Sequence, residues 1–117
     1  EDDLAVGDTV EAMLCELGHR VVRADGVDQA LKRLARRQPI DLMLTDLVMP
    51  GGRSGLDLAR AATTARPGLP VILSSGFTGE ALSAVTDAPW PLLRKPYSAE
   101  ALARAIARAL DPESQAA

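Results

Sequence analysis

Short apolar runs that end in polar residues alternate with segments of helical periodicity along this 117-residue sequence. The runs at 40–46 and 70–75 are mostly apolar until their last residues, which is typical of strands buried on both faces of a sheet. The segments between such runs are too long for hairpins, so crossover connections must join the strands. The alternation therefore predicts an α/β fold, with a parallel sheet and helices on both of its faces.

The same pattern predicts the individual elements. Helices are expected over about 5–17, from 27 to before 39, over 56–62, near 80–85 and from 98 to 110, and strands over 20–24, 40–46, 70–75 and 90–94. Gly18 is placed to end the first helix in a left-handed conformation, and Ser54 and Ser98 are placed as N-caps of later helices. Cys15 lies between leucines in a helical segment, so we expect its thiol to be buried.

Composition and charge limit the kinds of protein that this chain is expected to be. A length of 117 residues fits one compact domain, and we expect that domain over 1–112, followed by a flexible tail over 113–117. No stretch approaches the roughly 20 apolar residues that cross a bilayer, so membrane insertion is not expected. The net charge is -3 and the basic residues are scattered, which argues against direct nucleic-acid binding. A single cysteine allows no internal disulfide, which suits a cytoplasmic location.

Charged and hydroxyl groups stand where the predicted strands end. Asp46, Ser74 and Lys95 each follow an apolar run, and the acidic residues 1–3 precede the first helix. Taken singly, Asp46 is more simply a turn-forming acid and Lys95 a surface residue, and the acidic run is a favourable neighbour of a helix dipole. In a doubly wound sheet, however, functional groups cluster beyond the carboxyl ends of the strands. The joint occurrence of these residues therefore favours a functional site.

Four motifs hold these polar residues: EDDLAV at 1–6, LTDLVMPGG at 44–52, LSSG at 73–76 and LRKPY at 93–97. Together, in this order and spacing, they resemble the response-regulator receiver domain of two-component signalling over essentially the whole chain. The resemblance implies a flavodoxin-like (CheY-like) doubly wound sheet of strand order 2-1-3-4-5. In that fold an apolar strand precedes the acidic pair, so the first strand is missing from a sequence that begins at Glu1. We expect truncation of the sequence rather than a protein without this strand.

The resemblance also implies a phosphoryl-accepting site that uses Mg²⁺. Asp46 would accept the phosphoryl group from phosphohistidine on a histidine kinase or a histidine phosphotransfer protein. Asp2 would be the principal metal carboxylate and Glu1 an outer or water-mediated acid, while Asp46 and the backbone carbonyl of Val48 would also bind the ion. This donor set suits Mg²⁺, which prefers oxygen ligands and offsets the charge on the phosphoryl oxygens during transfer.

Three further residues receive roles from the same resemblance. Lys95 would neutralise a phosphoryl oxygen, and Pro96 after it would aim the lysine at the site. Ser74 would hydrogen-bond the phosphoryl group, with Ser75 as the alternative. The sequence departs from the family at Leu92, where many receivers carry an aromatic ring that swings inward. A rotating-ring switch is therefore not expected.

Two other functions stay open. One is a degenerate receiver that only binds another protein, although Asp2, Asp46 and Lys95 argue against it. The other is a phosphatase of the haloacid-dehalogenase type, which the lack of a second Asp two residues after Asp46 disfavours. For the receiver, we expect at most self-phosphorylation and autodephosphorylation activity. The sequence leaves open whether the domain stands alone or belongs to a hybrid sensor histidine kinase, and whether it forms a dimer.

Overall fold

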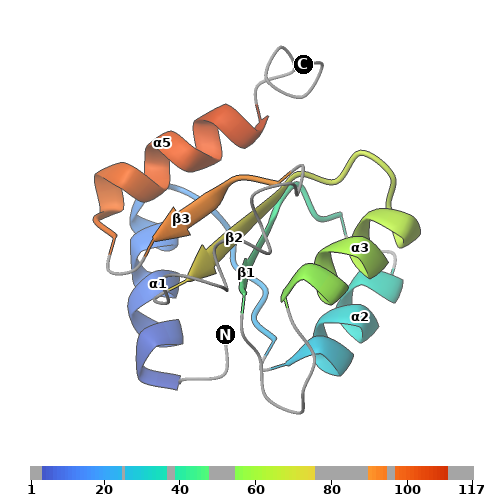
Figure 1. The fold of residues 1–117 in the computed structure, drawn as a ribbon. Coiled ribbons are helices and arrows are strands. Elements are labelled where there is room, and N and C mark those ends of the chain that lie inside the picture. Colours follow the sequence, from blue (N-terminus) through green and yellow to red (C-terminus); the bar gives the residue numbers. More distant parts are fainter. Residues whose placement is uncertain are drawn as a thin grey trace.

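A computed structural model describes residues 4–24, 26–36, 39–47, 55–75, 90–94 and 97–110. Its elements in chain order are α1 (Leu4–Glu16), α2 (Val27–Ala35), β1 (Met43–Asp46), α3 (Gly55–Ala65), β2 (Val71–Ser75), β3 (Leu92–Arg94) and α5 (Ala99–Leu110). The strands form a parallel sheet in the order β1-β2-β3. Helices α2 and α3 cover one face and α1 and α5 the other (Figure 1). The predicted layered α/β arrangement is confirmed, and each strand expected over 40–46, 70–75 and 90–94 is present but starts later.

The two faces of the sheet carry separate apolar clusters. The buried members of a cluster on the α3 side are Leu47, Ala59, Val71 and Leu73. The buried members of the cluster on the α5 side are Ile72, Leu102 and Ile106. Because successive residues of a strand point to opposite faces, β2 contributes to the two clusters in turn. This burial on both faces explains why the sequence of β2 is an almost unbroken apolar run.

Helix α1 ends as the sequence predicts, at a left-handed glycine. Gly18 has a φ of 92°. Its N–H donates to the carbonyl of Cys15 at 3.0 Å, and the N–H of His19 donates to the carbonyl of Leu14 at 3.0 Å. This is the Schellman pattern, which satisfies carbonyl groups in the last helical turn. The expectation of a buried Cys15 is wrong: Met13 and Leu14 pack on the α5-side cluster, and Cys15, farther round the helix, is exposed.

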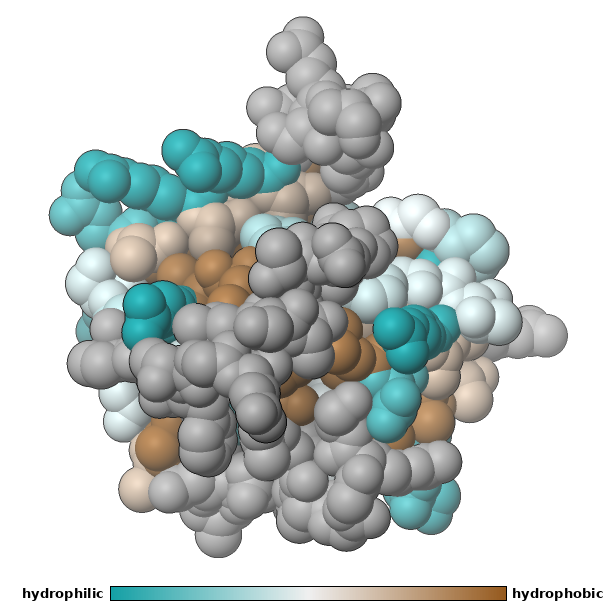
Figure 2. All heavy atoms as spheres, viewed as in Figure 1, coloured by the Kyte–Doolittle hydropathy of each residue, from teal (hydrophilic) through white to brown (hydrophobic). Residues whose placement is uncertain are grey.

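Helix α5 begins at the predicted cap. The N–H of Ala101 donates to the Ser98 side-chain oxygen at 3.1 Å, which satisfies a donor that has no partner within the helix. Farther along, Arg104 donates to Glu100 at 2.6 Å in an exposed pair one turn apart. Figure 2 shows the hydrophilic outer side of α5 at the upper left. The helix therefore packs with its apolar stripe and turns its charges to solvent.

A strand predicted over 20–24 is not formed, and that prediction is wrong for this structure. A strand requires a hydrogen-bonded neighbouring strand, and none of the described strands pairs with this segment. The segment is tied instead to α1 by an ion pair between Arg23 and Asp8, at 2.5 Å. The order 2-1-3-4-5 therefore stays a prediction for the strands that would lie beyond β1.

Other expected features fall outside the described residues. These are the cap at Ser54, the small helix near 80–85 and the tail over 113–117. The single domain over 1–112 likewise stays a prediction. Within the residues that the structure describes, no helix is long and apolar enough to cross a membrane.

Arg66, directly after α3, joins α3 to the end of α2. Its Nε and Nη2 donate to the carbonyl of Leu34 at 3.2 and 2.9 Å, and Nη2 also donates to the carbonyl of Arg36 at 2.7 Å. The last carbonyl groups of a helix receive no hydrogen bond from an N–H of the same helix, so they need donors from elsewhere. The guanidinium supplies them and fixes α2 beside α3.

Replacing Arg66 by methionine should lower the free energy of unfolding by about 1–2 kcal/mol, because charged donors to two carbonyl groups are lost while the aliphatic stem is kept. Urea unfolding of the variant and the wild type measures this difference. The matched control is Arg60→Met, which removes an exposed arginine of the same helix and should cost less than about 0.5 kcal/mol. Equal losses in the two variants would contradict a clamp at Arg66.

Candidate functional site

Asp46 and Ser74 are brought side by side by the register of the sheet. Asp46, the last residue of β1, is the parallel partner of Ser74 in β2. Residues two apart in a strand share a face, so both side chains lie on the face to which Leu44 and Ile72 contribute. Asp46 is 8% exposed and Ser74 is 2% exposed. The sheet thus presents a buried carboxyl and a buried hydroxyl together at its carboxyl edge.

A short hydrogen bond links these two side chains. The Ser74 hydroxyl donates to Oδ1 of Asp46 at 2.7 Å, a usual length for a hydrogen bond between two oxygens. The Thr45 hydroxyl donates to the backbone carbonyl of Asp46 at 3.1 Å. Burying a carboxylate without polar partners is costly, and the hydrogen bond from Ser74 reduces that cost. In the described part of the chain, no buried side-chain nitrogen or oxygen lacks a partner.

The backbone next to Asp46 is fixed on both sides. The N–H of Leu47 donates to the carbonyl of Ser74 at 2.7 Å, and the N–H of Gly55 donates to the carbonyl of Leu47 at 2.6 Å. The start of α3 is so close that a Cβ on Gly55 would overlap the Asp46 carbonyl oxygen and lie 3.0 Å from the Leu47 Cα. Sequence reasoning missed this role of Gly55. The available signal was a glycine where α3 begins, directly after the expected N-cap.

The structure tests only part of the predicted site. It brings Asp46 and Ser74 together, and by strand alternation Ser75 points to the opposite face. Leu92 is the partner of Leu73 in the ladder and packs, partly buried, on the α3-side cluster. The remaining predicted site residues lie outside the described residues, and their roles stay predictions: Glu1, Asp2, Val48, Lys95 and Pro96.

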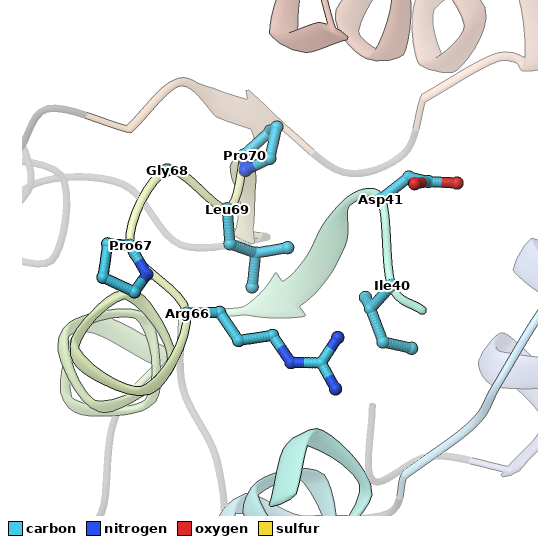
Figure 3. A pocket seen from close by; sticks show the side chains of 7 residues that line it. All are labelled: Ile40, Asp41, Arg66, Pro67, Gly68, Leu69 and Pro70. Carbon is cyan, nitrogen blue, oxygen red and sulfur yellow. The ribbon is translucent and has the colours of Figure 1, made fainter. Parts of the chain in front are cut away.

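A hollow of about 280 Å³ lies at the other end of the sheet. It is lined by Ile40, Asp41, Arg66, Pro67, Gly68, Leu69 and Pro70 (Figure 3). Asp41 and Pro70 precede β1 and β2, so the hollow is at the amino ends of these strands, whereas Asp46 is at a carboxyl end. Its one cationic group, on Arg66, already donates to carbonyl groups of the α2 end. The hollow is therefore no part of the Asp46 site.

The chemistry of Asp46 fits a magnesium ligand. Mg²⁺ commonly takes only one or two protein carboxylates and completes its shell with water and phosphate oxygens. Asp46 supplies one such carboxylate at the carboxyl edge of the sheet. The described residues hold no group of three or more potential metal-ligating His, Cys, Asp or Glu side chains. The other ligands predicted from the sequence, which are Glu1, Asp2 and the carbonyl of Val48, lie outside the described residues.

The sequence matches known receiver proteins over most of its length. The model of the family described as response regulator receiver domain matches residues 1–107. The response regulator receiver protein CpdR of Brucella abortus is 35% identical over 112 residues, which cover 94% of this chain and 92% of CpdR. The transcriptional regulatory protein GlrR of Escherichia coli is 30% identical over 118 residues, which cover 99% of this chain but 26% of GlrR.

Solved structures agree with this match. The receiver domain of NtrX from Brucella abortus is similar with a TM-score of 0.83 and 30% identity, over 96% of this chain and 95% of that one. A response regulator receiver protein from Sinorhizobium medicae has a TM-score of 0.85 at 22% identity, over 96% and 90% of the two chains, and supports the fold. Receiver domains act in two-component signal transduction, interact with histidine kinases or phosphotransfer proteins and generally depend on Mg²⁺. The chain belongs to the response regulator receiver domain family, with the CheY-like fold.

Proposed function

We propose that Asp46 accepts a phosphoryl group from phosphohistidine of a histidine kinase or a histidine phosphotransfer protein in the cytoplasm. The observation that carries the proposal is the buried Asp46 carboxylate, held by Ser74 at 2.7 Å at the carboxyl edge of a parallel sheet. The added negative charge then changes the surface that the domain offers to other proteins.

In the transfer step, a carboxylate oxygen of Asp46 forms a bond to phosphorus as the bond from phosphorus to the histidine nitrogen breaks. The electron pair of the broken bond stays on the imidazole. Strand β1 and the bonds from Leu47 to Ser74 and from Gly55 to Leu47 hold the nucleophile in place. This fixed position favours the transfer because in-line attack depends on positioning.

Electrostatic help would come from groups on either side of Asp46. Bound Mg²⁺ would offset the charge on the phosphoryl oxygens. Asp2, Asp46 and the carbonyl of Val48 would hold it, with Glu1 as an outer or water-mediated acid. On the phosphoryl side, Lys95 would supply an ammonium donor that Pro96 aims.

The proposal is tested by incubating the full-length polypeptide with Mg²⁺ and acetyl phosphate and measuring its intact mass. A gain of one phosphoryl group is expected, and chelation of Mg²⁺ should prevent it. If no adduct forms, the degenerate receiver that only binds a partner is favoured instead. Catalytic turnover of many phosphoesters would favour the phosphatase.

A further inference from the structure

Thr45, the residue before the proposed acceptor, buries a hydroxyl on the opposite face of the sheet from the Asp46 carboxylate. Consecutive residues of a strand point to opposite faces, and Thr45 is the parallel partner of Leu73, a buried member of the cluster on the α3 side. Thr45 is 3% exposed. A hydroxyl in an apolar layer is costly unless it is hydrogen-bonded, so this threonine needs a partner there.

That partner is the backbone of the acceptor itself. The Thr45 hydroxyl donates to the carbonyl oxygen of Asp46 at 3.1 Å. This carbonyl belongs to the peptide group that joins Asp46 to Leu47, and the N–H of the same group donates to the carbonyl of Ser74 at 2.7 Å. The peptide group is therefore held at both of its polar ends, by a side chain at one end and by β2 at the other.

The orientation of this peptide group fixes the direction in which the chain leaves the acceptor. Because a peptide group is planar, its rotation changes ψ of Asp46 and φ of Leu47 together and turns the next carbonyl, that of Leu47. The N–H of Gly55 donates to that carbonyl at 2.6 Å, and a Cβ on Gly55 would overlap the Asp46 carbonyl oxygen. The Thr45 hydroxyl thus stabilises the one orientation that suits both β2 and the start of α3.

We propose that Thr45 is a positioning residue that speeds phosphorylation of Asp46 by holding the peptide group between Asp46 and Leu47. This inference rests on the proposed function, because it concerns the same acceptor. With acetyl phosphate as donor, a carboxylate oxygen of Asp46 bonds to phosphorus while the bond from phosphorus to the acetate oxygen breaks, and acetate leaves with the electron pair. Thr45 exchanges no proton in this step. It acts through the backbone, since in-line transfer depends on how the nucleophile is placed.

The test uses two matched pairs of full-length polypeptides. Wild type is compared with Thr45→Val, which has the same shape, and Thr45→Ser with Thr45→Ala, which differs from it only by the hydroxyl. In each pair the protein with the hydroxyl should form the adduct roughly threefold to tenfold faster with acetyl phosphate and saturating Mg²⁺. An equal or lower rate for the protein with the hydroxyl, in either pair, would overturn the proposal. If the valine variant does not fold, the pair of serine and alanine variants decides.

Amide hydrogen exchange, measured by NMR without donor or Mg²⁺, separates positioning from a general loss of stability. In the valine variant, exchange of the Leu47 N–H should be roughly fivefold faster than in the wild type. The N–H of Met43 donates to the carbonyl of Pro70 at 2.9 Å at the other end of β1. Its exchange should change by less than about twofold. An equal change at the two amides, or none at Leu47, would contradict a role of Thr45 at the peptide group of the acceptor.

Failure of the inference differs from failure of the proposed function. Adduct formation at equal rates within the pairs would overturn only the role of Thr45. Absence of any adduct in the wild type would overturn both.

Discussion

The variant Asp46→Asn should form no phosphoryl adduct with acetyl phosphate and Mg²⁺, which intact mass measures. An amide oxygen lacks the negative charge that lets a carboxylate attack phosphorus. The substitution nearly preserves shape, and the amide oxygen can still accept the hydroxyl of Ser74, which lies 2.7 Å from Oδ1 in the wild type. The loss should therefore be chemical and not a consequence of unfolding.

The matched control is Asp41→Asn. Asp41 is an exposed carboxylate just before the same strand, and its loss removes the same charge from the chain. That variant should gain the phosphoryl group at the wild-type rate. Normal adduct formation by Asp46→Asn, or its loss in both variants, would contradict the assignment of the acceptor.

The variant Gly55→Ala should lower the free energy of unfolding by about 1–3 kcal/mol, because the new methyl group is forced into a filled space. Its Cβ would overlap the Asp46 carbonyl oxygen and lie 2.9 Å from the carbonyl carbon. These are backbone atoms of β1, which cannot move aside as a side chain does. Urea unfolding measures the loss, and the displaced backbone should also slow phosphorylation of Asp46.

The control for this prediction is Gly7→Ala, also at a buried glycine in a helix. There the three atoms nearest to the new Cβ all belong to the guanidinium of Arg23, the far end of a flexible side chain. Alanine favours a helix over glycine by up to about 1 kcal/mol, and loss of the partly exposed pair between Arg23 and Asp8 should cost at most about the same, so this variant should be close to the wild type in stability. If Gly55→Ala were as stable as Gly7→Ala, the tight contact between α3 and β1 would be contradicted.

Features that depend on local pattern could be predicted from the sequence. Strands buried on both faces must be apolar until they reach the edge of the sheet, so the sequence marks where β1 and β2 end. Parallel crossovers then place those ends at the same edge. The closeness of Asp46 and Ser74 follows from these two rules, and the structure confirms it. The end of α1 at Gly18 and the start of α5 at Ser98 could also be predicted from the sequence, because helix caps require particular residue types.

Features that depend on distant partners could not be predicted in this way. Val21 and Val22 favour an extended chain, but a strand exists only where another strand pairs with it. The exposure of Cys15 depends on which side of α1 meets α5, and helical periodicity in a mostly apolar segment does not fix that side. The lack of space at Gly55 arises where α3 meets β1, and no spacing in the sequence measures that distance.

The most direct measurement locates the phosphoryl group itself. The full-length polypeptide is phosphorylated with acetyl phosphate and Mg²⁺ and treated with sodium borohydride, which reduces an aspartyl phosphate to homoserine and leaves free carboxylates unchanged. Peptide mapping by tandem mass spectrometry then identifies the reduced residue. Homoserine at position 46, with every other aspartate intact, is the predicted result. Homoserine at a different aspartate with Asp46 unchanged would contradict Asp46 as the acceptor.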